Sequence, residues 1–171
     1  MKNAFTLVEM IVVVSIVLLL AGIGVATINK FNSGRKVETA GSELMTQIKL
    51  ARDMAITSQP PVGNSAFNFV RVMIATDLSM TATAATRDIN GNVTALQPDY
   101  FTNKKISGVN GLSIGSLPKS FGFWVGNGRL VDASGVPLNS GIGVTVMSGA
   151  GDTDDKKYFF IDKSGLINEK Q

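Results

Sequence analysis

The sequence predicts an α+β protein in which one long N-terminal helix packs on a β-rich head. Residues 10–28 are 19 uncharged and mostly apolar residues, and apolar residues at helical spacing continue as far as Ala55. Residues 62–171 instead contain short aromatic and β-branched runs separated by turn sequences such as Asn-Gly. We therefore expect four regions: a short segment 1–4, two helix halves 5–28 and 29–59, and a head 60–171.

Composition limits the classes of function. Lys and Arg number 16 against 13 Asp and Glu, and a net charge of +3 is too small by itself to indicate nucleic-acid binding. The chain has no Cys, which excludes disulfide and thiolate chemistry, and no His, the commonest general base and metal ligand. No Ser/His/Asp set, phosphate loop or catalytic pair of carboxylates can be assembled, so we do not expect an enzyme.

The uncharged run 10–28 is long enough to cross a membrane. As a helix it spans about 28 Å at ~1.5 Å per residue, against roughly 30 Å of hydrocarbon, and Lys2 would stay on the cytoplasmic side. The alternative is an ordinary cleaved secretory signal, because Gly24-Val25-Ala26 fits a small-residue cleavage site. The run is longer than the usual signal core of ~7–15 residues, however, and it follows the carboxylate of Glu9.

Residues 2–9 read Lys-Asn-Ala-Phe-Thr-Leu-Val-Glu, and a carboxylate at the edge of an apolar helix needs a charge partner. Together with the run behind it, this segment resembles the processing and assembly motif of type IV prepilins and pseudopilins. The resemblance implies a type IV pilin-like fold, cleavage of a 1–4 leader between Ala4 and Phe5, and N-methylation of Phe5. It also implies that Glu9 neutralises the Phe5 amine of a neighbouring subunit. The family usually has Gly at the position of Ala4.

The same resemblance implies where the protein acts and with what. We expect a single pass through the cytoplasmic (inner) membrane, surrounded by lipid, with the head outside the cytoplasm, followed by assembly into an extracytoplasmic filament. The expected partners are other pilin or pseudopilin subunits, a prepilin peptidase and an inner-membrane assembly platform. Type II secretion, pilus and competence systems all fit the motif.

The second half of the helix is predicted to be amphipathic. One apolar stripe is formed by Val37, Ala40, Leu44, Ile48, Ala51 and Ala55, with Glu38, Lys49 and Asp53 off it. The stripe should cover a sheet, and Pro60-Pro61 should end a helix that runs from Phe5 to Ser58.

Two further features of this helix have a bearing on function. Gly22, Gly24 and Gly34 weaken it locally, which fits either close packing between helices or a stretch that loosens when the subunit leaves the bilayer. Residues 41–56 contain Ala-Arg at 51–52 and Ala-Ile at 55–56. In this they resemble the corresponding helix of GspH/FimT-type minor pseudopilins.

The head is predicted from its strands and turns. Asn-Gly pairs at 90–91, 110–111 and 127–128 indicate hairpins, and Lys163-Ser164-Gly165 should turn the last strand. The expected strands are 67–75, 121–125, 129–131, 142–147, 157–161 and 166–167, and Trp124 is expected in the core. Thr76–Ala85, rich in Thr and Ala, is expected to be a surface loop or edge strand. Residues 158–167 again resemble the GspH/FimT head.

Three candidate ligand sites each have a simpler structural explanation. We expect no cofactor. Asp152, Asp154 and Asp155 could hold calcium, but a solvated turn is the preferred interpretation. Asp88-Ile-Asn90-Gly-Asn92 is likewise better explained as a hairpin than as a calcium loop. Lys104, Lys105 and Arg129 are the candidates for DNA binding, and the alternative is a generic basic surface.

The preferred interpretation is a structural subunit of a type IV filament or type II secretion pseudopilus, of the minor type, assembled through its helix and Glu9. The alternative is a minor pilin of a DNA-uptake or competence pilus whose head binds DNA. A membrane-anchored enzyme would require catalytic groups that the sequence does not offer.

Overall fold

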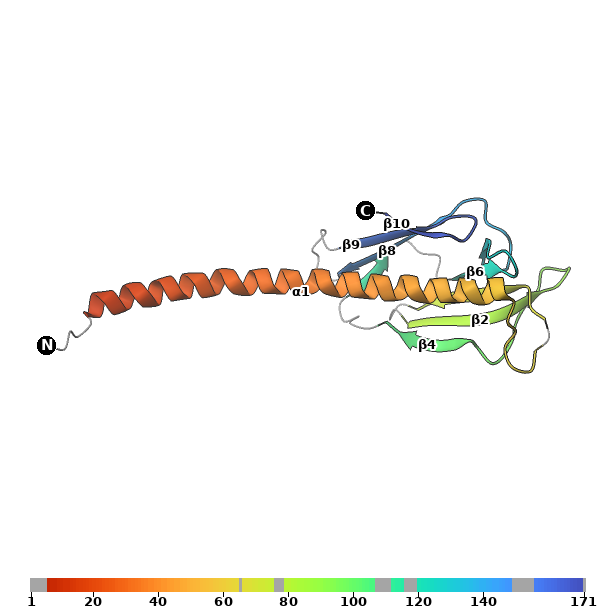
Figure 1. Cartoon of the computed structure of the whole chain (residues 1–171), viewed down its shortest axis with the longest axis horizontal. Coiled ribbons are helices and arrows are strands. Elements are labelled where there is room, and N and C mark those ends of the chain that lie inside the picture. Colours follow the sequence, from red (N-terminus) through yellow and green to blue (C-terminus); the bar gives the residue numbers. More distant parts are fainter. Residues whose placement is uncertain are drawn as a thin grey trace.

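A computed structural model of the chain describes residues 6–64, 66–75, 79–106, 112–115, 120–148 and 156–170. A single long helix, α1, runs through the molecule, and two antiparallel β-sheets gather around its C-terminal half (Figure 1). The N-terminal half of α1 extends away from the sheets (Figure 1). The α+β class and the order of helix before head agree with the prediction.

Helix α1 spans Leu7–Thr57, 51 residues, close to the expected range of Phe5–Ser58. Thr6 caps its start, because the Thr6 side chain accepts a hydrogen bond from the Glu9 backbone N–H. Ser58 ends it in the left-handed conformation and donates its N–H to the Ala55 carbonyl. The two prolines that follow prevent a further turn.

The predicted stripe on the second half of α1 is confirmed. All six of its residues are buried, and five of them are 0–1% exposed: Ala40, Leu44, Ile48, Ala51 and Ala55, with Val37 at 3%. The residues expected off the stripe, Glu38, Lys49 and Asp53, are exposed. The helical period therefore places one continuous apolar face against the sheets.

The larger sheet has six strands in the order β3-β2-β1-β6-β7, with β4 also pairing with β2. Their bounds are β1 Phe69–Ile74, β2 Ser79–Arg87, β3 Val93–Ala95, β4 Phe101–Lys105, β6 Ser120–Trp124 and β7 Leu130–Asp132. Strands β1 and β6 lie against α1. They bury Val70, Val72, Phe121 and Phe123 in the common core beneath the helix.

The smaller sheet has the order β10-β9-β8-β5. Its strands are β5 Leu112–Gly115, β8 Ile142–Ser148, β9 Lys156–Ile161 and β10 Ile167–Lys170. Strands β8 and β9 contact α1 and bury Val144, Phe159 and Ile161 in the same core. One helix therefore serves both sheets, and each sheet covers a different side of it (Figure 1).

Two of the predicted Asn-Gly hairpins are confirmed. Gly91 follows β2 and Gly128 follows β6, each with a positive φ (86° and 64°) that glycine adopts without strain. The Lys163–Gly165 turn also joins β9 to β10 as expected, with Gly165 at φ 81°. The pair at 110–111 lies outside the described residues.

The expectation for residues 76–85 was wrong over the part that the structure describes. Residues 79–85 belong to β2, which is flanked by β1 on one edge and by β3 and β4 on the other. Met80, Ala82, Ala84 and Ala85 are fully buried. Small side chains, read as poor core formers, here allow the sheet to pack closely where bulkier residues of neighbouring strands fill the space.

Trp124 lies half-buried on the far face of the larger sheet. It packs against a small second cluster of Phe69, Ala85 and Val131, whereas Phe121 and Phe123 enter the main core. The expectation of a core role is therefore met only in part, because Trp124 packs half-buried against this second cluster on the face opposite to α1. The same face has little room: a Cβ on Gly135 would lie 2.6 Å from the Phe69 ring.

We expect Leu44→Ala to reduce the free energy of unfolding by about 2–5 kcal/mol, because it removes a fully buried side chain and leaves a cavity beneath both sheets. Leu50→Ala, on the same helix but 42% exposed, is the matched control and should change stability by less than about 1 kcal/mol. Urea unfolding of the full chain in non-ionic detergent, followed by circular dichroism, measures both. Similar losses for the two leucines would contradict the assigned packing.

Candidate functional site

The first half of α1 is an uncovered apolar rod. Twelve large apolar side chains between Leu7 and Leu20 are 51–76% exposed, and they occupy every side of the helix. In Figure 1 this part of α1 has no strand beside it. Monomeric soluble proteins rarely expose apolar patches larger than a few hundred Å². A surface of this extent needs a cover from outside the chain.

Within the described part of the chain, the structure contains no helix with the length and apolar character that crossing a membrane requires. The membrane span over residues 10–28 therefore stays a prediction from the sequence.

Glu9 lies in the first turn of α1 and its side chain is exposed. The helix dipole favours a carboxylate at this end, and the Glu9 N–H is bound by the Thr6 hydroxyl at 3.3 Å. Ala4 and Phe5, the residues of the predicted cleavage site, lie outside the described residues. The structure thus places the carboxylate of the predicted Phe5–Glu9 pair but not the amine.

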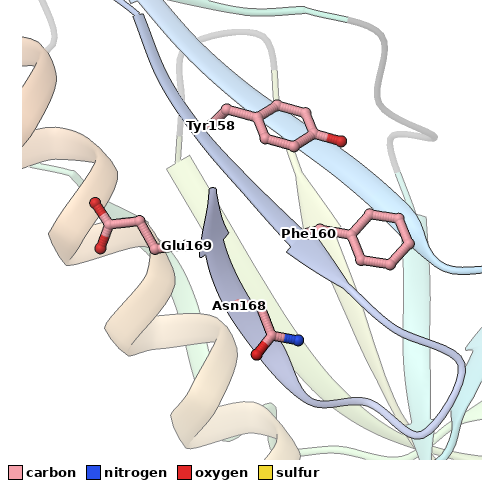
Figure 2. Close-up of a pocket in the computed structure, with 4 residues that line it drawn as sticks. All are labelled: Tyr158, Phe160, Asn168 and Glu169. Atoms are coloured by element: carbon pink, nitrogen blue, oxygen red, sulfur yellow. The ribbon is translucent and has the colours of Figure 1, made fainter. Parts of the chain in front are cut away.

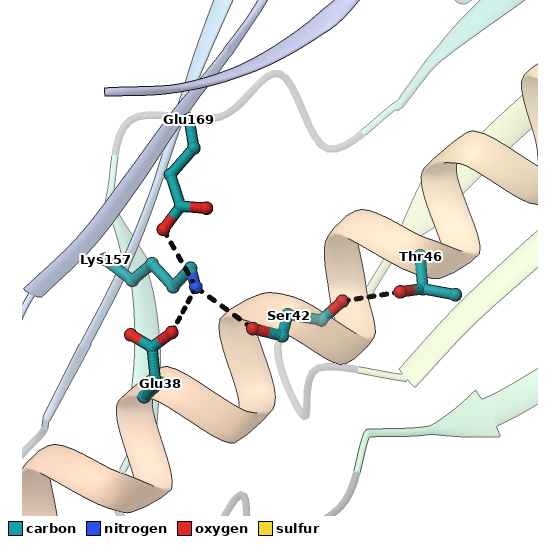
Figure 3. Close-up of polar contacts among 5 residues, drawn as sticks. All are labelled: Glu38, Ser42, Thr46, Lys157 and Glu169. Carbon is teal, nitrogen blue, oxygen red and sulfur yellow. Dashed lines mark hydrogen bonds and ion pairs between the residues drawn. The ribbon is translucent and has the colours of Figure 1, made fainter. Parts of the chain in front are cut away.

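A polar junction joins α1 to the smaller sheet where the helix leaves the head. Lys157 of β9 is only 6% exposed, and its ammonium contacts the carboxylate oxygens of Glu38 at 2.6 Å and Glu169 at 3.0 Å. It also donates to the Ser42 hydroxyl at 3.0 Å. Figure 3 shows these three acceptors converging on one nitrogen from α1 and β10. Three acceptors satisfy all three donors of the ammonium.

Gly41 makes this junction possible. The lysine stem crosses α1 at Gly41, where an added Cβ would lie 2.6 Å from the Lys157 Cδ atom. Glu38, which precedes Gly41 on the helix, and Ser42, which follows it, accept hydrogen bonds from the Lys157 ammonium. The glycine therefore lets a strand and a helix approach closely enough for a buried cation to be paired.

The junction controls the charge state of Lys157. Burial by itself would lower the pKa of the ammonium, but the hydrogen bonds and negative charges of Glu38 and Glu169 outweigh burial and raise it above its ordinary value. Lys157 is therefore charged at neutral pH. It is a structural cation and not a poised base.

The sequence analysis did not identify this junction, although two signals point to it. Lys157 occupies the same alternating strand positions as the buried Phe159 and Ile161, so the pattern places it on the inner face. Gly41 lies beside the buried stripe of α1, one residue from Ala40. A lysine predicted to face a helix across a glycine is a paired cation, but only the fold shows which carboxylates pair with it.

The calcium candidates gain no support. Asp152, Asp154 and Asp155 lie outside the described residues, and no cluster of three metal-ligating side chains occurs among the residues that are described. Asp88 instead braces the β2–β3 hairpin: its carboxylate accepts hydrogen bonds from the backbone of Asn90 and Asn92 at 2.9 and 2.8 Å. Chiefly the hydrogen bond from the Asn92 side chain keeps the Asp88 pKa below its ordinary value.

The candidates for DNA binding are not brought together. Lys104 and Lys105 belong to β4, where they lie opposite Met80 and Ser79 of β2 in the sheet register. Arg129 immediately precedes β7. Three strands, β2, β1 and β6, lie between β4 and β7 in the sheet. At ~4.8 Å per strand the two groups are roughly 19 Å apart across the sheet. The side chains of Lys104 and Lys105 lie outside the described parts of the structure.

Arg129 instead lies beside a residue that the sequence did not associate with it. A shallow depression of about 380 Å³ is lined by Asn127, Arg129, Lys163 and Ser164. The first two belong to the β6–β7 turn and the last two to the β9–β10 turn. Two turns of different sheets therefore present two cations to one hollow.

A second hollow of about 400 Å³ lies on β9 and β10 and is lined by Tyr158, Phe160, Asn168 and Glu169. Tyr158 and Phe160 alternate with the buried residues of β9, so their rings point away from α1, while the Glu169 carboxylate points toward it (Figure 2). The Tyr158 ring covers Gly143 of β8, where a Cβ would lie 2.7 Å from the Tyr158 hydroxyl. The rings fill space that glycines leave, and Glu169 is the one charged residue among the described residues that line this hollow.

Comparison with known proteins gives one likeness in structure. No protein-family model and no curated protein sequence matches this chain. Among solved structures, the minor pseudopilin EpsH of the type 2 secretion system of Vibrio cholerae is similar over 77% of this chain and 92% of its own. The identity is 15% and the TM-score 0.44.

We expect Lys157→Met to destabilise the head by about 1.5–3 kcal/mol, because the stem is kept while the charged hydrogen bonds to Glu38, Ser42 and Glu169 are lost. Lys156→Met, the exposed neighbour on β9, is the matched control and should be nearly neutral. Urea unfolding in detergent at neutral pH measures both. Equal effects of the two substitutions would contradict the junction.

The pH dependence of that difference follows from the raised pKa of Lys157. A group whose pKa is higher in the folded state contributes stability that is fully present below the unfolded value of about 10.4. The contribution disappears as pH rises through the folded value. The difference in free energy of unfolding between the original chain and Lys157→Met should therefore stay constant from neutral pH to about pH 10 and become smaller only above it.

Asp162 braces the β9–β10 turn and predicts the opposite pH dependence. Its carboxylate accepts from the Ser164 hydroxyl at 2.6 Å and from the Ser164 and Leu166 N–H groups. Chiefly the Ser164 hydroxyl lowers its pKa, so its contribution is present above about pH 4 and lost as pH falls through the folded value. Asp162→Asn should cost on the order of 1 kcal/mol at pH 7. The difference should vanish in acid, and Asp53→Asn on exposed helix surface should show neither effect.

Proposed function

We propose that this chain is a structural subunit of a type IV filament or type II secretion pseudopilus, of the minor pseudopilin type, and that its work is assembly and not catalysis. The observation that carries the proposal is the uncovered rod of twelve large apolar side chains between Leu7 and Leu20. The head is complete without this rod, because its core is closed by the second half of α1. The rod therefore has its partner outside the chain.

Two apolar environments can surround a helix that is exposed on every side, and the chain would occupy them one after the other. Before assembly, lipid of the inner membrane surrounds residues 10–28, with the head outside the cytoplasm. After assembly, the corresponding helices of neighbouring subunits replace the lipid. Both environments are apolar, so the transfer exchanges one set of dispersion contacts for another without exposing the helix to water.

Glu9 supplies registration in this scheme. A prepilin peptidase would cleave between Ala4 and Phe5 and leave an α-amino group at Phe5. The Glu9 carboxylate of a subunit already in the filament would then pair with that amine, because a charge pair in an apolar bundle costs far less than two separate charges. The exposed position of Glu9 in the first turn of α1 leaves it accessible to a neighbour.

The junction at Lys157 supports the same role. A filament subunit must hold its head at a set angle to the helix that is packed in the filament. Lys157 joins α1 to β9 and β10 near Glu38, where the covered part of the helix begins. The head is thus attached to α1 by paired charges at one end of the contact and by the buried stripe along its length.

We expect Glu9→Ala and Glu9→Gln to leave membrane insertion and cleavage nearly unchanged, since removal of a charge eases insertion and the Ala4–Phe5 bond is untouched. Both should lower incorporation into filaments at least tenfold. A Phe5 amine without its partner would cost on the order of 3–5 kcal/mol in the bundle. The amount of cleaved subunit in sheared filaments, against that left in the membrane, is the measurement, and mass spectrometry checks that the cleaved chain begins at Phe5.

Asp53→Ala is the control for that experiment, because it removes an exposed carboxylate from the same helix beyond the apolar rod. It should be incorporated normally. Normal incorporation of both Glu9 variants would rule out registration by Glu9, and a mature N-terminus near Thr27 would establish an ordinary secretory signal.

A further inference from the structure

The depression at Arg129 and Lys163 is built by direct contact between two turns of different sheets. Gly128 and Gly165 both have positive φ values, 64° and 81°. Any Cβ on Gly165 would collide with the Gly128 carbonyl oxygen. The Leu130 N–H also donates to the Lys163 carbonyl at 3.2 Å. The two turns are therefore held against each other by backbone, and both positions need glycine.

Each turn is also braced from within. The Asn127 side chain accepts a hydrogen bond from the Arg129 N–H at 3.0 Å. The Asp162 carboxylate does the same for the Ser164 N–H at 2.8 Å. Such Asx turns fix the backbone from which the two cationic side chains start. The approach of Arg129 to Lys163 is a property of the fold and not of two mobile loops.

The cations in the depression have no counterion among the described residues. None of the hydrogen bonds and ion pairs there uses the Arg129 guanidinium or the Lys163 ammonium. A third cation comes from the helix: Arg52 lies between the two glycine turns, and its buried Nε has no hydrogen-bond partner in the described parts. Among the described residues, the Asp162 carboxylate accepts hydrogen bonds from its own turn and also feels the Arg52 charge, which helps to lower its pKa. One carboxylate therefore faces three cations. Positive charge is therefore in excess at this point.

We infer that this depression is a docking site for a carboxylate-bearing segment of a partner protein. The Arg129 guanidinium offers a planar fork that matches a carboxylate, and the Lys163 ammonium adds a point charge. The Asn127 side-chain amide nitrogen lines the same hollow and supplies an uncharged donor. This inference does not depend on membership in a filament.

The size and surroundings of the site favour an acidic protein segment over a nucleic acid. Its volume of about 380 Å³ suits one or two acidic side chains. Nucleic-acid affinity comes from many phosphate contacts along a basic path, and the other candidate lysines, Lys104 and Lys105, lie across the sheet on β4. The site lies beside Arg52 and Ile56, near the C-terminal end of α1. These two residues lie roughly 70 Å along the helix from Leu7 at ~1.5 Å per residue, so a partner bound there would not meet the apolar rod.

The test uses the full chain in non-ionic detergent with fluorescein-labelled hexaglutamate as the probe and fluorescence anisotropy at low salt as the measurement. The site variant is Arg129→Gln with Lys163→Gln. The matched control is Arg87→Gln with Lys156→Gln, which removes one Arg and one Lys from exposed positions elsewhere. Hexaglutamine tests whether carboxylates are required. Because neither cation of the site is paired within the described residues, the site variant should unfold at the same urea concentration as the original chain.

We expect the site variant to weaken hexaglutamate binding at least fivefold, a change that corresponds to the upper range for one exposed ion pair. The control variant should change it by less than twofold, and hexaglutamine should not bind. Equal losses in the two variants, or no binding of hexaglutamate at low salt, would overturn the inference. A 20-base-pair DNA duplex is the remaining arm. Tighter binding of the duplex that is lost only in the site variant would replace the acidic segment with a nucleic acid.

Discussion

The structure depends on the burial of a single helix face. The stripe from Val37 to Ala55 is the surface on which both sheets close, since β1 and β6 contact one side of it and β8 and β9 another. Neither sheet covers its own inner face without α1, although the β6–β7 and β9–β10 turns also contact each other directly. The helix is thus the centre of the head as well as the part that leaves it. This arrangement makes the two sheets and the second half of α1 one folding unit.

The polar groups of the head follow from that constraint. Lys157 is buried because β9 must lie against α1, and burial is tolerated because Glu38, Ser42 and Glu169 pair with its ammonium. Gly41 removes the side chain that would hold strand and helix apart. The same close approach ends near Gly126, whose N–H donates to the Ala55 carbonyl at 3.0 Å. Polar contacts at both ends of the stripe therefore set how the head sits on the helix.

The two halves of α1 separate two tasks. The covered half carries a head that is closed within itself, and the uncovered half has apolar side chains that require an external partner. The cationic depression lies at the end of the molecule farthest from the uncovered half. A chain built in this way offers an apolar surface at one end and a cationic surface at the other, with the core between them.

Sequence by itself determined the helix, its buried stripe, the hairpin glycines and the motif around Glu9, because each depends on residues near one another in the chain. It did not show that β2 lies inside the sheet, since the burial of small residues such as Ala82 and Ala84 depends on bulkier neighbours in other strands. Only the tertiary structure decided that Lys157 meets Glu38, 119 residues away, and that Arg129 meets Lys163 and not Lys104. Local periodicity specifies which face is apolar. The pairing of distant charges is specified by how strands and helix pack, and no local pattern encodes it.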